Sequence, residues 1–315
     1  MLVSICVPLY NVEDCIERCA VSLFEQSYPE KEFIFVDDCS PDSSVDKLRQ
    51  VMTRYPEIKE QTRIICHEKN RGLAAARNTA LDNCNGEFVI HVDSDDYLDT
   101  DAVKKLVTRQ TETDADIVTG QAIRIDKGMV CIMERPHFLA HDDFVADMIR
   151  PSIHHTVWGR LIRKSLYIDF NIRVKEGINI GEDLQIMSKL AYYAKKVETI
   201  WDVVYYYDCT NALSYMNLFD VKDFYRLSQD TASMEIVRDF FIGKNEKFQD
   251  CAEKYLSRYY LDQLRFFGHS GMRDDFDRTK ELLTELKPQN RRMSAKLRAM
   301  FHNYLSFKIT EFLFK

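Results

Sequence analysis

The sequence lacks the two glycine-rich motifs with which many α/β proteins hold phosphate groups. No G-x-G-x-x-G follows the first apolar run, and no G-x-x-x-x-G-K-[ST] occurs anywhere in the 315 residues. These absences exclude the usual dinucleotide-binding fold and the P-loop nucleotide hydrolases. If this chain handles phosphates, a carboxylate-bound divalent cation is the natural substitute for a glycine-rich loop.

Cysteine pairs, long apolar runs and an excess of positive charge are also missing. The nine cysteines include no C-x-x-C pair, which is typical of reduced thiols rather than of disulfides or a zinc site. No apolar run approaches the ~20 residues that span a bilayer, and no basic stretch precedes the first run as in a signal peptide. A formal net charge of -7 disfavours nucleic-acid binding. We therefore expect a cytoplasmic protein.

What is present is a regular alternation of strand and helix patterns over the first hundred residues. Short apolar runs are separated by amphipathic segments, of which the alanine-rich stretch 73–81 is the clearest. This order predicts an α/β fold in which helices flank a mainly parallel sheet. The apolar runs cover residues 2–7, 33–36, 63–66 and 87–92.

The pattern of apolar residues changes near residue 214. Beyond it the apolar residues follow helical spacing, and no further strand pattern occurs. We therefore expect two parts: an α/β domain over residues 1–215 and an all-helical C-terminal region over residues 216–315.

Polar residues gather where the apolar runs end. Asn11 follows the first run, Asp37 and Asp38 follow the second, and the acidic segment 93–96 follows the fourth. Carboxyl ends of parallel strands meet at one edge of a sheet, where such folds bind ligands. Carboxylates two residues apart can direct oxygens toward one point, and Mg²⁺ and Mn²⁺ prefer oxygen ligands. The pattern favours a metal site over the simpler alternative, an acidic turn that caps the next helix.

Taken in order, the motifs resemble those of family 2 glycosyltransferases, which have the GT-A fold of nucleotide-diphospho-sugar transferases. The resemblance covers roughly Val3 to Tyr215 and implies a cytoplasmic enzyme of polysaccharide biosynthesis. It implies inverting, metal-dependent transfer of a hexosyl or N-acetylhexosaminyl group from a nucleotide sugar, with UDP favoured, to a hydroxyl of a glycan or lipid-linked acceptor. The matching segments are 7–11, 36–42, 70–72, 76–78, 86–96, 158–161, 181–183 and 205–207.

The same resemblance assigns roles on the donor side. Asp38 would accept the imide hydrogen of uracil, and Asp95 would be the first choice for a direct ligand of Mn²⁺ or Mg²⁺. Asp93 would bind the metal or the donor ribose, whereas Asp96 is expected to cap the following helix. Cys39 departs from the family pattern, which usually has glycine or asparagine there. The residues implied to bind the donor are Pro8, Tyr10, Asn11, Asp38, Arg77, Asp93 and Ser94.

On the acceptor side the resemblance makes Asp183 the catalytic base, and places Trp158 and Glu182 at the acceptor or sugar wall. A base is needed because the acceptor hydroxyl must lose its proton as it attacks. The adjacent Glu182 would raise the pKa of Asp183 by like-charge repulsion. Without the resemblance, the two acids would simply suit the first turn of a helix. The tyrosine run 205–207 is interpreted as packing.

The C-terminal segment differs in charge from the rest of the chain. Residues 287–315 hold seven Lys and Arg against one Glu, a net of +6, which leaves -13 on the preceding chain. A basic amphipathic helix over 291–315 predicts contact with an anionic membrane on its cytosolic face. The alternative is packing on the rest of the chain or on a second copy in a homodimer.

Other classes of protein remain possible on the sequence alone. A phosphatase of the haloacid-dehalogenase type also uses D-x-D, but it expects threonine where Tyr97 stands. A sugar nucleotidyltransferase would need a glycine-rich basic loop in place of segment 8–11. A non-catalytic sugar-nucleotide-binding protein is disfavoured by the intact Asp93, Asp95 and Asp183.

Overall fold

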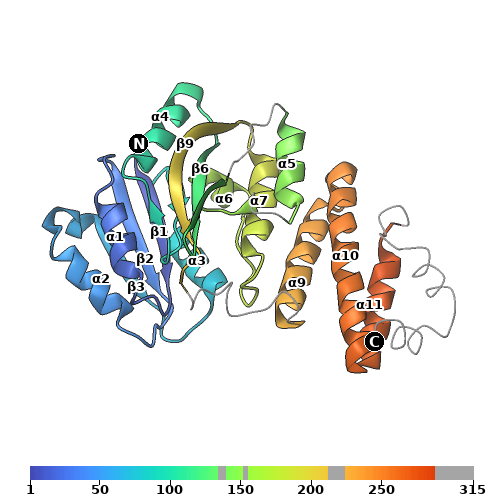
Figure 1. Ribbon diagram of the computed structural model, residues 1–315. Helices are drawn as coiled ribbons and strands as arrows, with labels where there is room; N and C mark the ends of the chain where they lie inside the picture. The colour runs from blue at the N-terminus through green and yellow to red at the C-terminus, as the bar shows by residue number, and fades with distance from the viewer. Residues whose placement is uncertain (134–139, 152–154, 212–223, 288–315) are drawn as a thin grey trace.

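The computed structural model describes residues 1–133, 140–151, 155–211 and 224–287 (Figure 1). An α/β part with one curved sheet is followed by a helical part, so the predicted fold class is confirmed. The predicted domain boundary at 215/216 and the predicted tail helix over 291–315 lie outside the described residues. Among the residues described, no helix is both long and apolar enough to cross a bilayer.

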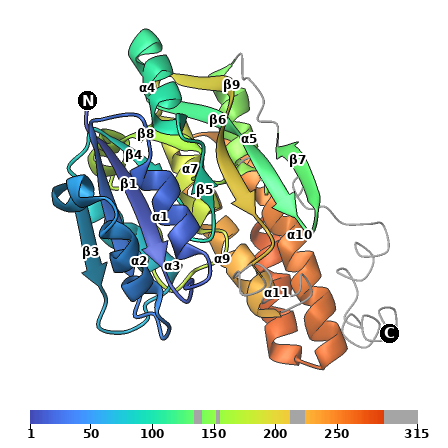
Figure 2. The ribbon, with the colours of Figure 1, turned by 60° about the vertical axis from the view of Figure 1, so that its left-hand side comes forward.

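Within the described residues the sheet has nine strands, of which four neighbouring strands are parallel in the order β3-β2-β1-β4. Beyond β4 the sheet becomes mixed, because β8 pairs antiparallel with both β4 and β6 while β9 runs parallel to β6. Strand β3 and the β6–β7 hairpin lie at opposite sides of the molecule (Figure 2). The strands are β1 (Val3–Leu9), β2 (Lys31–Asp37), β3 (Thr62–Cys66), β4 (Phe88–His91), β5 (Tyr97–Leu98), β6 (Ile117–Asp126), β7 (Met129–Met133), β8 (Arg160–Arg163) and β9 (Val197–Asp208).

Helices cover both faces of the sheet, as the alternation of side chains along the strands requires. Ile5 of β1 faces a core that it shares with α1, α2 and α4, whereas the neighbouring Cys6 faces a core shared with α3, α5 and α7. The C-terminal helices α9 to α11 extend this second core (Figure 1). The helices are α1 (Ile16–Phe24), α2 (Ser44–Met52), α3 (Leu73–Asp82), α4 (Ala102–Thr113), α5 (His141–Ile149), α6 (Lys164–Asp169), α7 (Glu182–Tyr193), α9 (Phe224–Phe241), α10 (Glu246–Ser270) and α11 (Arg273–Glu285), with a 3-10 turn η1 (Pro56–Gln61).

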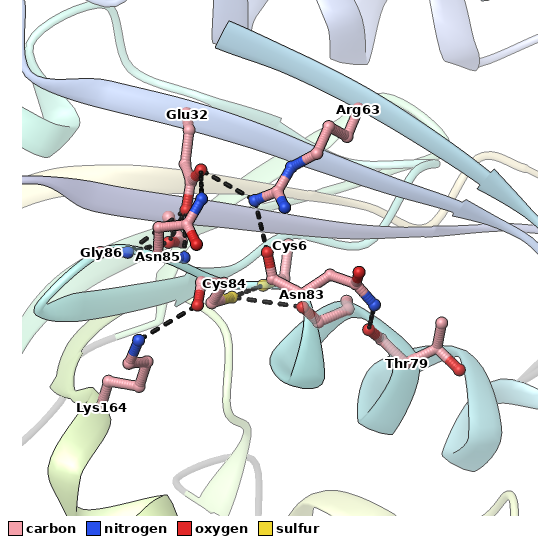
Figure 3. A network of polar contacts seen from close by, with 11 residues as sticks. Cys6, Glu32, Arg63, Thr79, Asn83, Cys84, Asn85, Gly86 and Lys164 are labelled. Carbon is pink, nitrogen blue, oxygen red and sulfur yellow. Dashed lines mark hydrogen bonds and ion pairs between the residues drawn. The ribbon is translucent and has the colours of Figure 1, made fainter.

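A buried carboxylate, Glu32 of β2, fixes the turn that leads into β4 (Figure 3). Its Oε1 accepts hydrogen bonds from the Ser4 hydroxyl at 2.5 Å and from the Asn85 amide at 2.6 Å. Its Oε2 accepts from Arg63 Nη2 at 2.9 Å. Burial raises the pKa of Glu32, but these hydrogen bonds and the Arg63 charge outweigh it and hold the pKa below its ordinary value. The charged carboxylate thereby sets the start of β4, the strand that leads to Asp93.

We expect Glu32→Ala to lower the free energy of unfolding by at least about 2 kcal/mol, because it leaves the buried Ser4 hydroxyl without its acceptor and removes the partner of the Asn85 backbone amide. Urea unfolding monitored by circular dichroism measures this loss. The matched control is Glu30→Ala, whose side chain is exposed just before the same strand and whose loss should be within ~0.5 kcal/mol. Equal effects of the two variants would contradict the prediction.

Candidate active site

The ends of β1, β2 and β4 lie side by side, and two of the turns that follow them adopt left-handed backbone conformations. Asn11 has φ 55° and Cys39 has φ 60°. Asparagine tolerates this region, whereas it is uncommon for most other residues with a side chain. The conformation gives a physical reason for the glycine or asparagine that the family pattern has where Cys39 stands. Both turns bring the chain back across the strand ends.

The predicted donor residues near these turns differ in exposure. The Tyr10 ring is 48% exposed and is free to stack on a planar group, whereas Pro8 and Ser94 are buried. The Asn11 amide donates to Ser40 Oγ at 3.3 Å, so it joins the β1 turn to the β2 turn. Of these residues, Tyr10 presents the largest surface to a ligand.

Asp38 is 3% exposed, and both of its carboxylate oxygens are hydrogen-bonded. Oδ1 lies 2.7 Å from His67 Nδ1 and accepts from the Arg71 amide at 2.9 Å, while Oδ2 accepts from the Gly72 amide at 2.6 Å. His67 Nε2 in turn lies 2.9 Å from Thr79 Oγ1. Asp38 therefore holds loop 70–72 against the strand ends, and its contact with a base stays a prediction.

Arg77 of α3 brings three carboxylates from distant parts of the chain together. Its Nη2 lies 2.9 Å from Asp93 Oδ1, 3.4 Å from Glu182 Oε1 and 3.6 Å from Asp183 Oδ1. The side chain is 2% exposed, and its Nε and Nη1 have no hydrogen-bond partner within the described parts of the chain. Buried donors without partners are rare, and they mark a place where a ligand with acceptor oxygens can bind.

The two adjacent acids begin α7 directly after Gly181, which has φ 74°. Asp183 is anchored because its Oδ2 accepts a hydrogen bond from the Val157 amide at 3.1 Å, while its Oδ1 lacks one among the residues described. One oxygen is thus fixed by the backbone and the other is available as a hydrogen-bond acceptor. This is the arrangement that a general base needs.

Burial and the neighbouring Asp183 raise the pKa of Glu182 to about 8, although Arg77 opposes the shift. Glu182 therefore keeps its proton near neutral pH and can donate a hydrogen bond. Burial also raises the pKa of Asp93, again against the charge of Arg77. Repulsion between the two adjacent acids thus contributes to the raised pKa of Glu182, whereas the prediction concerned Asp183.

Asp96 does not cap the following helix, so that prediction is wrong. It is completely buried, accepting from the Tyr205 hydroxyl at 2.7 Å and from the Asp208 amide at 2.8 Å, and the residue at the N-cap of α4 is Asp101. The Tyr205 hydroxyl also accepts from the Asp93 amide at 3.1 Å. The tyrosine run 205–207 thus does more than pack, since one member fixes the segment after β4.

Trp158 lies behind this tyrosine. Its ring is parallel to that of Tyr205, with the ring centroids 4.3 Å apart, and the residue is 4% exposed. The structure therefore gives Trp158 a packing contact that orients Tyr205. Its predicted contact with the acceptor or the sugar remains a prediction.

Sequence reasoning missed Arg18 of α1, which holds the other end of the acidic segment. Its Nη2 donates to the Asp95 carbonyl oxygen at 2.9 Å, its Nη1 lies 2.5 Å from Asp208 Oδ2, and its guanidinium sits 4.7 Å above the Tyr97 ring. No motif surrounds Arg18, so the sequence held no signal for it. His67 was also missed, although its position directly after the third apolar run could have indicated it.

The acidic segment fits a divalent cation only together with a ligand. No group of three or more His, Cys, Asp and Glu side chains able to hold a metal occurs within the described residues. Mg²⁺, however, commonly uses one or two carboxylates and takes its remaining ligands from water and substrate phosphates. Asp93 and Asp95 are the two carboxylates predicted to supply that smaller set, and Asp93 Oδ1 lies 2.9 Å from Arg77 Nη2. Their binding of a metal stays a prediction.

The sheet has acids at the carboxyl ends of its strands, where open α/β sheets bind their ligands, and Arg77 of α3 lies against one of them. The family described as Glycosyl transferase family 2 matches residues 4–170. The chain belongs to that family, which confirms the resemblance seen in the sequence.

Two bacterial glycosyltransferases are similar to this chain in sequence. Poly(ribitol-phosphate) beta-glucosyltransferase of Bacillus spizizenii is 29% identical over 299 residues, 93% of this chain and 43% of the relative. A second relative bears the name putative teichuronic acid biosynthesis glycosyltransferase TuaG and comes from Bacillus subtilis. It is 36% identical over 47% of this chain and 58% of its own length. The chain thus spans about half the length of these relatives.

Solved structures share the fold. The crystal structure of S. aureus TarS 1-349 in complex with UDP-GlcNAc has a TM-score of 0.71 at 20% identity and covers 100% of this chain and 89% of that one. The mannosyltransferase PcManGT of Pyrobaculum calidifontis, in complex with GDP-Man and Mn²⁺, has a TM-score of 0.56 at 16% identity, over 99% of this chain and 83% of that one. At these identities the likeness concerns the fold.

We expect the free energy of unfolding to fall as the pH rises, because the folded chain then loses the Glu182 proton. In the unfolded chain this proton leaves near the ordinary pKa of 4.5, whereas in the folded chain it leaves at about 8. Its stabilising contribution is therefore complete below about pH 4.5 and lost as the pH rises through 8. Glu182→Gln removes this titration, so unfolding free energies measured in urea should fall less steeply over that range.

Glu57→Gln, an exposed glutamate in η1, is the control and should retain the native pH dependence. If Glu182→Gln gave the same slope as the native chain, Glu182 would be ionised in the fold.

Proposed function

We propose that this chain is an inverting, metal-dependent glycosyltransferase that moves a sugar from a UDP-sugar to a hydroxyl of a glycan or lipid-linked acceptor. The product would be a cell-surface polysaccharide of the teichoic-acid type, as the names of the two relatives suggest. The observation that carries the proposal is the buried Arg77, which joins Asp93 on the donor side to Asp183 on the acceptor side.

On the donor side, Tyr10 would stack on the base, and the free Nε and Nη1 of Arg77 would donate to diphosphate oxygens. A Mn²⁺ or Mg²⁺ ion held by Asp95 and Asp93 would neutralise the charge that develops on the departing diphosphate. Support for a UDP donor comes from the fold shared with the UDP-GlcNAc complex, and the GDP-Man complex makes GDP the alternative nucleotide.

On the acceptor side, Asp183 would take the proton of the attacking hydroxyl through Oδ1, while the Val157 amide holds Oδ2. Protonated Glu182 would donate a hydrogen bond to the acceptor or to the sugar. A single attack from the face opposite the diphosphate inverts the anomeric carbon. Trp158 would support this wall from behind, through Tyr205.

The tail over residues 291–315 belongs to the same proposal. Its positive charge would hold the enzyme on the anionic inner face of a membrane, where lipid-linked acceptors are found. The competing use of the tail is the interface of a homodimer. A non-catalytic sugar-nucleotide-binding protein is the alternative function, and turnover distinguishes the two.

A screen of UDP- and GDP-sugars with Mn²⁺ or Mg²⁺ should find one whose hydrolysis the native chain accelerates. Asp95→Ala should reduce that rate by about 10²-fold or more, because the departing diphosphate loses its metal. Chelation of the metal should reduce the native rate to a similar level. Asp169→Ala, an exposed change at the end of α6, should leave the rate unchanged. Native-like turnover by Asp95→Ala would refute the metal-dependent mechanism.

Asp183→Asn should reduce sugar transfer by about 10²-fold or more, because an amide cannot accept the hydroxyl proton. Its side-chain oxygen can still accept from the Val157 amide, so the fold and donor binding should persist. Isothermal titration with UDP measures donor binding, and product formation measures transfer. A parallel loss of both would assign Asp183 a structural role instead.

A further inference from the structure

Helix α9 contacts the segment that leads into the catalytic helix α7. We propose that Ser233 and Gln229 of α9 are positioning residues that set where Asp183 stands. This inference rests on the proposed function, in which Asp183 is the base. Neither residue touches the reacting atoms, and both would act by holding the backbone of residues 177–181.

Ser233 is completely buried and makes two hydrogen bonds on either side of Asp183. Its hydroxyl donates to the Ile180 carbonyl oxygen at 2.8 Å, just before α7. The same oxygen accepts from Gln185 Nε2 at 3.0 Å, within the first turns of α7. Because both partners lie within three residues of Asp183, a shift of Ser233 moves the base with it.

Gly181 shows how closely α9 approaches. A methyl group placed there would lie 2.9 Å from Ser233 Oγ and 3.0 Å from Ser233 Cβ, closer than ordinary contact distance. The residue also has φ 74°, which favours glycine. A glycine at position 181 therefore lets the turn before the two acids pack closely against α9.

Gln229 holds residues 177–179, which precede Ile180, and links them to the proposed donor side. Its Oε1 accepts from the Asn179 amide at 2.8 Å, and its Nε2 donates to the Gly177 carbonyl oxygen at 3.4 Å. The Asn179 side chain accepts from the Ala74 amide at 3.1 Å, at the start of the helix that carries Arg77. Helix α9, which lies beyond the family match at 4–170, therefore supports two of the elements that carry the buried cluster, α3 and α7.

Positioning by α9 predicts a selective loss of turnover. With the nucleotide sugar that the native chain turns over, Ser233→Ala should lower kcat by about ten-fold, since small displacements of a catalytic group cost large factors in rate. The affinity for UDP should stay within about two-fold, because Tyr10 and loop 70–72 do not depend on Ser233. The matched control is Ser228→Ala on the same helix, whose hydroxyl donates to Tyr225 O within α9 and whose kcat should equal the native value.

A second pair of variants makes the test independent of lost packing. Gln229→Glu keeps the acceptor for the Asn179 amide and should retain most of kcat, whereas Gln229→Met keeps the length but removes that acceptor and should lose about as much as Ser233→Ala. Native kcat in both Ser233→Ala and Gln229→Met would overturn the inference while leaving the glycosyltransferase intact. Equal falls of kcat and UDP affinity in Ser233→Ala would also overturn it, as general destabilisation. A native chain that neither binds nor turns over any UDP- or GDP-sugar would instead refute the proposed function.

Discussion

The structure depends on one buried guanidinium. Arg77 lies between carboxylates that the sequence separates by about a hundred residues, and removing any partner leaves charge in a low-dielectric setting. Three acids around one arginine cannot all be ionised cheaply, and burial together with the charge of Asp183 raises the pKa of Glu182. The cluster holds Asp93 Oδ1 at 2.9 Å and Asp183 Oδ1 at 3.6 Å from the same Arg77 nitrogen, which brings the proposed donor-side and acceptor-side acids together.

The two sides of this cluster are built differently. Asp93 follows a parallel strand whose start is fixed by the charged Glu32, so its position comes from sheet geometry. Asp183 stands on a helix that reaches the same point through a left-handed glycine and a neighbouring helix. The position of Asp93 therefore follows from backbone pairing within the sheet, whereas that of Asp183 follows from contacts between helices.

Sequence reasoning reached the alternation of elements, the family and the strand-end acids, because each leaves a local pattern. It misjudged Asp96, whose partners Tyr205 and Asp208 arrive from a strand more than a hundred residues away. It could not foresee Arg18, since a single arginine on an amphipathic helix looks like any solvated residue. Contacts between distant elements decide these roles, and one sequence does not encode them in readable form.

Burial changes what each predicted residue can do. Tyr10 is exposed and can contact a ligand directly. Trp158 and Asp38 are buried, and they contact other parts of the chain: Trp158 stacks on Tyr205, and Asp38 accepts from the Gly72 amide. A residue with satisfied contacts acts by fixing others, as Trp158 does for Tyr205 and Asp38 does for loop 70–72. Arg77 and Asp183 each keep unused donors or acceptors within the described parts of the chain. A ligand that satisfies both must bring acceptor oxygens to the arginine and a hydroxyl to the carboxylate, which is what a nucleotide sugar and its acceptor supply together.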